Sequence, residues 1–461
     1  MSSPSYLRKN ISLAWPLALN GLLMQSMLMI DTLLISPLGE IPLAALGIAS
    51  AILAFMLGVQ MALANGTQLI LSRAVGSGNS NLLTKGFWAG LSINFAVALV
   101  FCISMYFGAQ SIVSSLSDDL LLQQQTKGYL ELAIYLVPST AIAQVLIALF
   151  NSRNKSKTPL KGYLIEMPIN AVLSYFLIHG VDAFHGMDFS EGMGVQGAAL
   201  GSVIAIVIRL LYLVVCLRMD HTLDLEFNSG LSTLIKSIRL HSVEIFPFAA
   251  NITILQIGIS VYQLLYSQLS INAYAAIILI MPWLRGIGQF VASWAHASAI
   301  SISQAIGSKK LDNLAENINK SIDVAVIVSI ICAGAFVVLH FFLPSIYPDL
   351  EKETYLALSV IAPLYIFLPI VRGYNTVHGH ILRALGKTTS VFKINFIGQW
   401  VVSIPLCAVI ILYFDASIFW AFAIQPFEEI IKALPFRQLA RKSVKEFNQA
   451  KIDELMYDEE K

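Results

Sequence analysis

Long apolar stretches recur along almost the whole chain, and they constrain its fold more than any other feature. Each is long enough to cross about 30 Å of hydrocarbon as a helix. Only 12% of the 461 residues are charged, against roughly 25% in soluble domains. Helices satisfy their own backbone hydrogen bonds in lipid, so the pattern predicts an all-α integral membrane protein. Twelve transmembrane helices are expected near residues 11–36, 44–72, 86–110, 129–151, 162–180, 195–218, 240–266, 274–303, 322–344, 356–382, 391–413 and 416–435.

The connections between these stretches alternate in charge. One set, together with both termini, holds most of the Lys and Arg, among them Arg153, Lys155, Lys157, Lys161, Lys309, Lys310 and Lys320. The other set is mainly acidic and includes Asp118, Asp119, Asp182, Asp188, Glu191, Asp349, Glu351 and Glu353. An excess of Lys and Arg marks the cytoplasmic side. The sequence therefore predicts a multi-pass protein of the cell's inner (plasma) membrane with both termini in the cytoplasm.

The chain contains two copies of one unit. Shifting the sequence so that Pro16 meets Pro247 makes ten of thirty positions identical, including Asn20 with Asn251 and Gln25 with Gln256. Composition alone would give two or three such identities, so the match indicates an internal repeat. Each copy has six predicted helices, and an even number gives both copies the same orientation in the membrane.

The repeat predicts two pseudo-symmetric six-helix bundles. We expect an N-terminal lobe over residues 1–225, a C-terminal lobe over 226–436 and a polar cytoplasmic tail over 437–461. Two such lobes that rock around a central cavity give alternating access in secondary transporters. The sequence has no GxxxxGK[ST] loop, so an ion gradient is the expected source of energy.

Several motifs then resemble one transporter family. They are "MIDTLLIS" in the first helix, "ALANGTQLILSRAVGSGN" at the end of the second, "PINAVLSYFLIHG" in the fifth and "GVQGAALGSVIA" in the sixth. Together with the two six-helix halves, they resemble the MATE (multidrug and toxic compound extrusion) transporters over essentially the whole chain. The resemblance implies a cation-coupled antiporter that exports amphipathic, cationic, drug-like compounds in exchange for protons or sodium.

Asp31 is the sole acid within the first predicted helix. A charge inside the membrane is costly, so such a residue usually faces a cavity and marks an ion or proton path. The alternative is that Asp31 has a structural role near the membrane surface, where water reaches it. The matching position of the second copy is Tyr262, so the acid is not duplicated although Asn20 and Gln25 are. Ion coupling is therefore predicted in the N-terminal lobe.

The resemblance extends this site to three further residues. DinF-like and archaeal MATE proteins carry an aspartate at the position of Asp31, and N-x-x-x-D and a threonine in helices five and six. Here those positions hold Asn170, Ser174 and Ser202, so the second acid is missing. NorM-like members carry acids in helices seven and ten, where this chain has Gln256 and Arg372. The chain is thus closer to the DinF-like type.

Coupling through this site requires one carboxylate that changes its charge. A dry environment favours the protonated carboxyl and a nearby cation favours the carboxylate, so proton and cationic substrate would compete at Asp31. Sodium is an alternative coupling ion, with oxygen ligands at Asp31 and Asn170. Glu166 lies four residues before Asn170 and is either a second proton carrier or an interfacial partner of Lys161.

The expected substrate cavity includes the duplicated polar residues and two further side chains. We assign to it Asn20, Gln25, Asn251, Gln256, Tyr262 and Arg372. No resident metal or cofactor is expected, because the four cysteines lie singly in apolar runs. The basic residues are not interleaved with aromatics, which excludes nucleic acid as a partner. Small molecules and membrane lipid are the expected partners of a monomer.

Two other functions are open. A lipid-linked precursor flippase of the same superfamily would show a strongly cationic cavity, for which Arg285 and Arg372 are the candidates. An integral-membrane enzyme would need a cluster such as HExxH on facing helices, and the sequence contains none.

Overall fold

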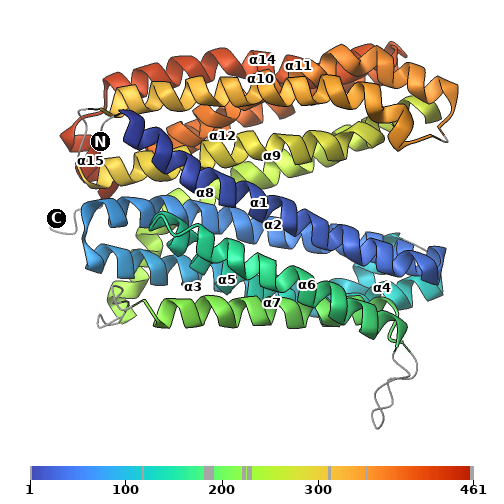
Figure 1. The fold of residues 1–461 in the computed structure, drawn as a ribbon, viewed down its shortest axis with the longest axis horizontal. Coiled ribbons are helices and arrows are strands. Elements are labelled where there is room, and N and C mark those ends of the chain that lie inside the picture. Colours follow the sequence, from blue (N-terminus) through green and yellow to red (C-terminus); the bar gives the residue numbers. More distant parts are fainter. Residues whose placement is uncertain are drawn as a thin grey trace, which may run out of the picture. The chain divides into compact units, whose positions relative to one another are not determined.

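The computed structural model describes residues 3–116, 119–180, 192–220, 225, 231–309, 313–348 and 350–456. This part of the chain is helical and contains no strand. The elements, which Figure 1 shows, are α1 (Ser3–Ile35), η1 (Ser36–Leu38), α2 (Glu40–Ser77), α3 (Ser80–Leu116), α4 (Leu120–Ala133), α5 (Leu136–Ser152), α6 (Lys157–His179), α7 (Val195–Arg218), α8 (Leu231–Tyr266), α9 (Ile271–Gly307), α10 (Leu314–Ile346), α11 (Lys352–Ala384), α12 (Thr388–Phe396), η2 (Ile397–Ser403), α13 (Ile404–Ala408), η3 (Val409–Tyr413), α14 (Ile418–Lys445) and α15 (Gln449–Met456).

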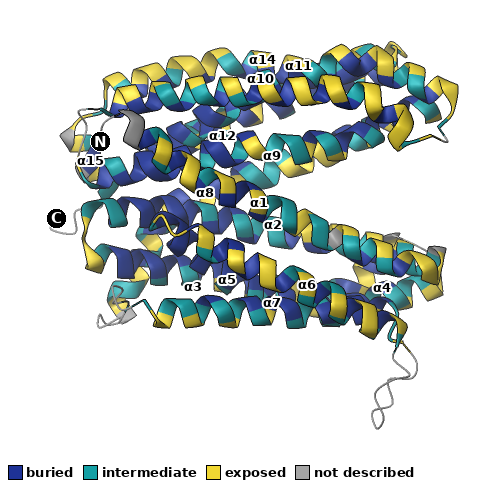
Figure 2. Ribbon diagram, viewed as in Figure 1, coloured by how far each residue is buried: buried dark blue, intermediate teal, exposed yellow. Residues whose placement is uncertain are grey.

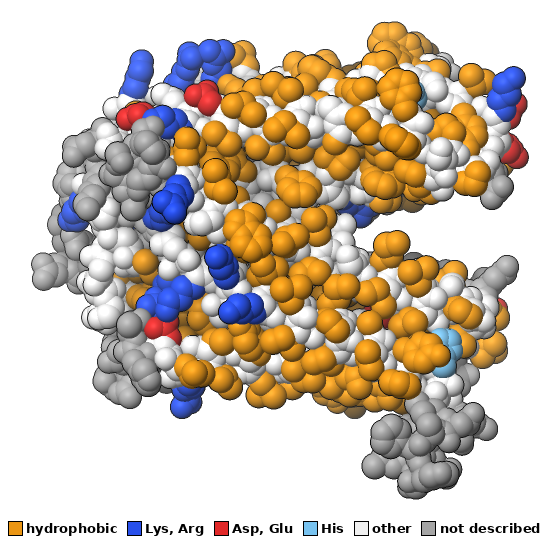
Figure 3. Space-filling view, in the orientation of Figure 1, with side chains coloured by type: hydrophobic (Ala, Val, Ile, Leu, Met, Phe, Trp, Pro, Cys, Tyr) orange, Lys and Arg blue, Asp and Glu red, His pale blue; other side chains and the backbone are white. Residues whose placement is uncertain are grey.

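The long helices have the length and composition of membrane spans. Among the described residues, nine are long and apolar enough to cross a membrane, and α4 with α5 make a tenth if that pair, bent by 41°, is one span. Only 24% to 39% of the residues in the nine apolar windows are buried. Figure 3 shows apolar side chains covering much of the visible helix surface. These faces are suited to contact with lipid rather than water.

Two further helices complete the predicted set of twelve. The predicted spans 162–180 and 416–435 overlap α6 and α14, apart from one residue at the end of the first and two at the start of the second. Both contain charged residues, with Glu166 in α6 and Glu428, Glu429 and Lys432 in α14. These charges explain why neither helix is apolar enough to count as a span by composition alone. The span predicted near 391–413 is continuous but includes two π-helical segments, η2 and η3.

The chain divides into two compact units. The N-half unit comprises Leu19–Val75 and Asn79–Phe246, and the C-half unit comprises Met1–Ala18, Gly76–Gly78 and Pro247–Lys461. The boundary between the two units therefore lies within α1 and within α8. The boundary between the two lobes predicted from the repeat lies between α7 and α8.

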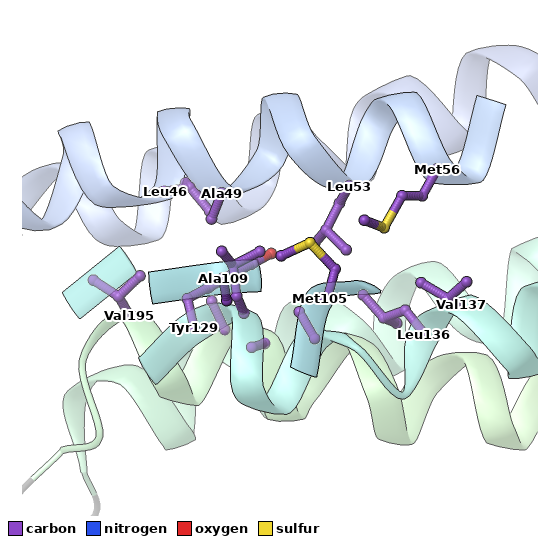
Figure 4. Close-up of a cluster of buried hydrophobic side chains, with 14 of the residues drawn as sticks. Leu46, Ala49, Leu53, Met56, Met105, Ala109, Tyr129, Leu136, Val137 and Val195 are labelled. Carbon is purple, nitrogen blue, oxygen red and sulfur yellow. The ribbon is translucent and has the colours of Figure 1, made fainter. Parts of the chain in front are cut away.

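Each unit has its own apolar core. In the N-half unit, Leu53, Met56, Met105 and Tyr129 belong to a buried cluster that also includes residues of α5 and α7 (Figure 4). The C-half unit has a second cluster around Tyr266, Phe336, Tyr365 and Phe422. In Figure 2 the buried residues line the inner faces of the helices and the exposed residues lie on their outer faces.

The polar tail is more ordered than the predicted solvated end. α14 continues to Lys445, and α15 follows over Gln449–Met456. Ile452 is fully buried. Gly386, at φ +75°, lies so close to Leu455 that a Cβ there would come within 2.4 Å of Leu455 Cδ2. The tail therefore packs on the C-half unit, although residues 457–461 lie outside the described part.

Candidate functional site

The structure brings three of the predicted ion-coupling residues together in the N-half unit. Asp31 of α1 is 5% exposed. Ser202 Oγ of α7 donates a hydrogen bond to Asp31 Oδ2 over 3.2 Å. Asn170 Nδ2 of α6 donates to Ser202 Oγ over 2.9 Å. Three helices thus contribute to one hydrogen-bonded chain, which we call the Asp31 site.

Close packing of α6 against α7 places Ser174 beside this chain. A Cβ at Gly201 would lie 2.7 Å from Ser174 Oγ and 2.9 Å from the Ser174 backbone nitrogen. Only glycine permits that approach without a shift of one helix. Ser174 is fully buried, and its neighbour across the interface directly precedes Ser202.

The Asp31 site contains hydrogen-bonding groups but no cation. Among the described residues, no Lys, Arg or His lies within ion-pair distance of Asp31. Asp31 Oδ1, Asn170 Oδ1 and Ser174 Oγ are buried without a hydrogen-bond partner. The described chain also has no group of three His, Cys, Asp or Glu side chains that could hold a metal ion. An uncompensated carboxyl of this kind can bind and release a proton, and the free oxygens are also of the type that binds sodium.

Glu166 lies on the same helix as Asn170 but has a different environment. Arg209 Nη1 of α7 is 2.8 Å from Glu166 Oε2, and the two side chains are 4% and 6% exposed. The Arg209 guanidinium carbon also lies 4.2 Å from the centroid of the Tyr163 ring. The partner of Glu166 is therefore a buried arginine. One of the two alternatives from the sequence had named Lys161 instead. Arg209 was missed, although a lone arginine in the middle of "AIVIRLLY" was a visible signal.

The C-half unit contains a cavity of about 350 Å³, which we call the C-half cavity. Three of the predicted substrate-cavity residues line it, namely Gln256, Tyr262 and Arg372. Asn251 lies next to it, because Asn395 Nδ2 from the cavity wall donates to Asn251 Oδ1 over 2.9 Å. Asn20 and Gln25 belong to the N-half unit. Asn20 is buried, whereas Gln25 is exposed.

A cluster of buried charges on α14 forms one wall of the C-half cavity. Lys432 Nζ lies 2.8 Å from Glu428 Oε1 and 3.2 Å from Glu429 Oε1. Tyr262 Oη donates to Glu428 Oε2 over 2.5 Å. Asn375 Nδ2 donates to Glu429 Oε2 over 2.8 Å. Each carboxylate is thus held by the shared ammonium and by a second donor.

We did not predict this cluster from the sequence and expected ion coupling in the N-terminal lobe alone. The signal was the run "PFEEIIKALPF", with three charges inside a predicted span. Arg372 also faces these acids, since its Nε lies 3.5 Å from Glu429 Oε1 and its Nη2 donates to Gln425 Oε1 over 3.2 Å. The C half therefore carries two buried acids, Glu428 and Glu429, and each of them has a cationic neighbour.

Polar contacts also join residues of the first repeat to residues of the second. Within the N-half unit, Arg73 Nη1 donates to Glu244 Oε1 over 3.0 Å, and both side chains are buried. Glu244 is thus part of a buried ion pair. Within the C-half unit, the hydroxyl groups of Tyr6 and Ser321 lie 2.7 Å apart. Ser301 Oγ donates to Asn10 Oδ1.

Comparison with known proteins identifies the family. The family model MatE matches residues 16–176 and 247–409, so its two matches begin at the prolines that the internal repeat aligns. The chain belongs to the MATE family. This confirms the resemblance on which the sequence-based expectations rested. MATE proteins are transporters that need no cofactor, so the integral-membrane enzyme is excluded.

Curated relatives and solved structures agree with this assignment. The chain is 23% identical over 412 residues to the uncharacterized transporter YisQ of Bacillus subtilis, covering 86% of this chain and 85% of that one. It is 23% identical over 405 residues to the multidrug resistance protein NorM of Vibrio cholerae, with the same coverage. The bent form of the Vibrio cholerae MATE transporter VcmN superposes with a TM-score of 0.82 at 16% identity, covering 98% of this chain and 99% of that chain. The eukaryotic MATE transporter AtDTX14 gives 0.82 at 15% identity, with the same coverage.

The likeness to these structures confirms the predicted fold class, an all-α membrane fold of twelve transmembrane helices in two bundles. The chain is therefore a multi-pass member of a multidrug efflux transporter family whose members bind small-molecule substrates.

Proposed function

We propose that the protein is a proton-driven antiporter that exports small amphipathic organic compounds across the plasma membrane. The observation that carries the proposal is the Asp31 site. Asp31 is buried, its neighbours Ser202 and Asn170 are uncharged, and no cation among the described residues holds it in its ionised form. Such a carboxyl can be protonated from one side of the membrane and deprotonated to the other.

In this proposal Asp31 carries the coupling proton. The hydrogen-bonded chain of Ser202 and Asn170, with Ser174 beside it, orients the carboxyl and stabilises whichever form is present. Glu166 is left out of the coupling step, because Arg209 compensates its charge at 2.8 Å. Sodium coupling is the alternative, since the unpartnered oxygens of Asp31, Asn170 and Ser174 are hard ligands.

Alternating access is the mechanism that we propose for this cycle. The contacts that join the two repeats, Arg73 with Glu244 and Tyr6 with Ser321, involve helix ends that the charge pattern predicts to be cytoplasmic. A cysteine at position 155 or 310 should accordingly be labelled only from inside, and one in the 182–191 loop only from outside. Both the 182–191 loop and position 310 lie outside the described residues.

A transport assay with separate gradients tests the function. The purified protein in proteoliposomes should accumulate a fluorescent amphipathic substrate when a pH gradient alone is imposed, with no sodium on either side. Arg441→Gln provides the control variant, because Arg441 is exposed and is not among the residues of the C-half cavity or the Asp31 site. Transport that responds only to a sodium gradient would contradict the proton assignment, and transport under neither gradient would contradict antiport itself.

A further inference from the structure

The walls of the C-half cavity carry more positive than negative charge. Four cationic side chains line it, namely Arg285, Arg372, Arg383 and Lys432. The carboxylates that line it are Glu428 and Glu429. Lys432 contacts both carboxylates and Arg372 lies beside Glu429, so these four charges compensate one another. Arg285 and Arg383 are the two cationic side chains of the cavity wall that do not belong to this group.

The two remaining arginines differ in their exposure. Arg285 is exposed. Arg383, near the end of α11, is only 5% exposed. Among the described residues no carboxylate lies within ion-pair distance of Arg383, and its Nε has no hydrogen-bond partner. A buried charge without a counter-charge is costly, and proteins normally supply a partner.

The surroundings of Arg383 leave room for a ligand to be that partner. Its guanidinium carbon lies 4.7 Å from the centroid of the Phe248 ring, which covers one face of the group. His380, one helical turn earlier on α11, lines the same cavity and adds a polar ring. Arg383 itself lines the cavity, so a molecule bound there can reach its guanidinium.

The rest of the cavity wall is apolar enough to hold the body of such a ligand. Ile252, Leu255, Ile259 and Leu284 line it together with the polar residues. Its volume of about 350 Å³ falls in the range of sites for small drug-like molecules, which is roughly 300–1,000 Å³.

We propose that the C-half cavity binds an amphipathic organic anion, whose carboxylate or phosphate group pairs with Arg383 while its apolar part lies along α8 and α9. A planar guanidinium is well suited to this role, because it can donate two parallel hydrogen bonds to one oxyanion. The proposal names a substrate class for the antiporter and in that respect rests on the proposed export function. It differs from the cationic substrates that the family resemblance implies.

Binding to the purified full-length chain in phosphatidylcholine nanodiscs tests the site without any gradient. The anionic probes are 1-naphthoate and 1-naphthyl phosphate. The control ligands have the same naphthyl group and are 1-naphthylmethanol, which is uncharged, and 1-naphthylmethylammonium, which is a cation. Calorimetry should show the two anions binding at least about tenfold more tightly than the alcohol and the ammonium, the size expected for one charge-assisted hydrogen bond. Equal binding of all four probes would overturn the proposal.

Three variants locate the anion. Arg383→Gln should reduce the affinity for 1-naphthoate to that for the alcohol, and Arg383→Lys, which keeps the charge, should retain part of it. Arg441→Gln is the control, because Arg441 is exposed and does not line the cavity, and it should change the affinity by less than about twofold. An equal loss in Arg383→Gln and Arg441→Gln would mean that the anion is not held by Arg383 and would overturn the proposal.

The source of the oxyanion is distinguished by repeating the titration in nanodiscs that contain phosphatidylglycerol. Unchanged binding of 1-naphthoate assigns the site to soluble anions, and competition assigns it to a lipid phosphate group. Because no gradient is involved, a failure of this experiment leaves the proton-driven export proposal standing. Failure of the gradient assay would likewise leave the anion site standing.

Discussion

The acid and its hydroxyl partner change places between the two halves of the molecule. In the first repeat Asp31 lies on the first helix, α1, and accepts a hydrogen bond from Ser202 on the last helix, α7. In the second repeat the position that matches Asp31 is Tyr262 on α8, which donates to Glu428 on α14. Both halves therefore join their first and last helices through a carboxyl and a hydroxyl, although the residues differ.

The difference in nearby charge explains what each pair can do. Asp31 has uncharged neighbours, and among the described residues it has no ion-pair partner. Glu428 and Glu429 share Lys432, and Glu429 also has Arg372 beside it. A cation within about 4 Å favours the ionised carboxylate, whereas burial without one favours the neutral acid. The first half is thus suited to a change of protonation, and the second half to fixed charges.

Removal of the shared cation should have the largest effect on stability. Lys432→Met leaves two buried carboxylates without their ammonium, and loss of one partner of a buried ion pair costs about 3–5 kcal/mol. The melting temperature of the purified protein should fall accordingly. The double variant Lys432→Met, Glu428→Gln should recover most of the loss, because the remaining carboxylate of Glu429 keeps Arg372 as its cation. An unchanged melting temperature in Lys432→Met would show that these carboxylates do not need the cation.

Loss of the tyrosine hydroxyl in the second half should have the second-largest effect on stability. Tyr262→Phe removes a hydrogen bond to the Glu428 carboxylate, which forms an ion pair with Lys432, and hydrogen bonds to charged groups contribute about 1.5–3 kcal/mol. Chemical unfolding of the purified variant measures the change. Tyr266→Phe is the matched control, since its hydroxyl accepts from the neutral side chain of Gln425 over 3.2 Å and should matter less.

Loss of the serine hydroxyl in the first half should have the smallest effect. Ser202→Ala removes a hydrogen bond to Asp31, and a bond to an uncharged acid contributes about 1 kcal/mol. The same unfolding experiment, at a pH where Asp31 is neutral, measures it. A loss as large as that of Tyr262→Phe would mean that Asp31 is ionised, and the contrast between the halves would fail.

Much of the fold was predictable because membrane helices leave a strong signal. Each of the twelve apolar runs overlaps helices of the structure, although α4 begins at Leu120, before the run 129–151. The aligned pair Pro16 and Pro247 revealed the duplication, and the two family matches begin at the same prolines. The bend between α4 and α5 and the π-helical segments of the eleventh span were not predictable from apolar periodicity. They depend on backbone hydrogen bonding, which hydropathy does not record.

The Asp31 site could be predicted in part, and the α14 cluster was missed for a physical reason. An isolated acid such as Asp31 stands out in an apolar run, and the family motif pointed to Asn170 and Ser202. The charges of Glu428, Glu429 and Lys432 are visible in a predicted span, but their grouping at one cavity depends on how α8 and α11 pack against α14. The pairing of Glu166 with Arg209 depends on how α6 packs against α7, which neither helix reveals alone.

The most direct test of the contrast between the two halves compares two kinds of transport by Asp31→Asn in one set of proteoliposomes. A site that cannot change its charge offers no coupling between the pH gradient and the substrate, but it need not prevent substrate exchange. We predict that this variant retains the exchange of labelled for unlabelled substrate and loses accumulation driven by a pH gradient. Glu428→Gln paired with Lys432→Met should retain both. Accumulation at the wild-type level by Asp31→Asn would contradict the assignment of proton coupling to Asp31.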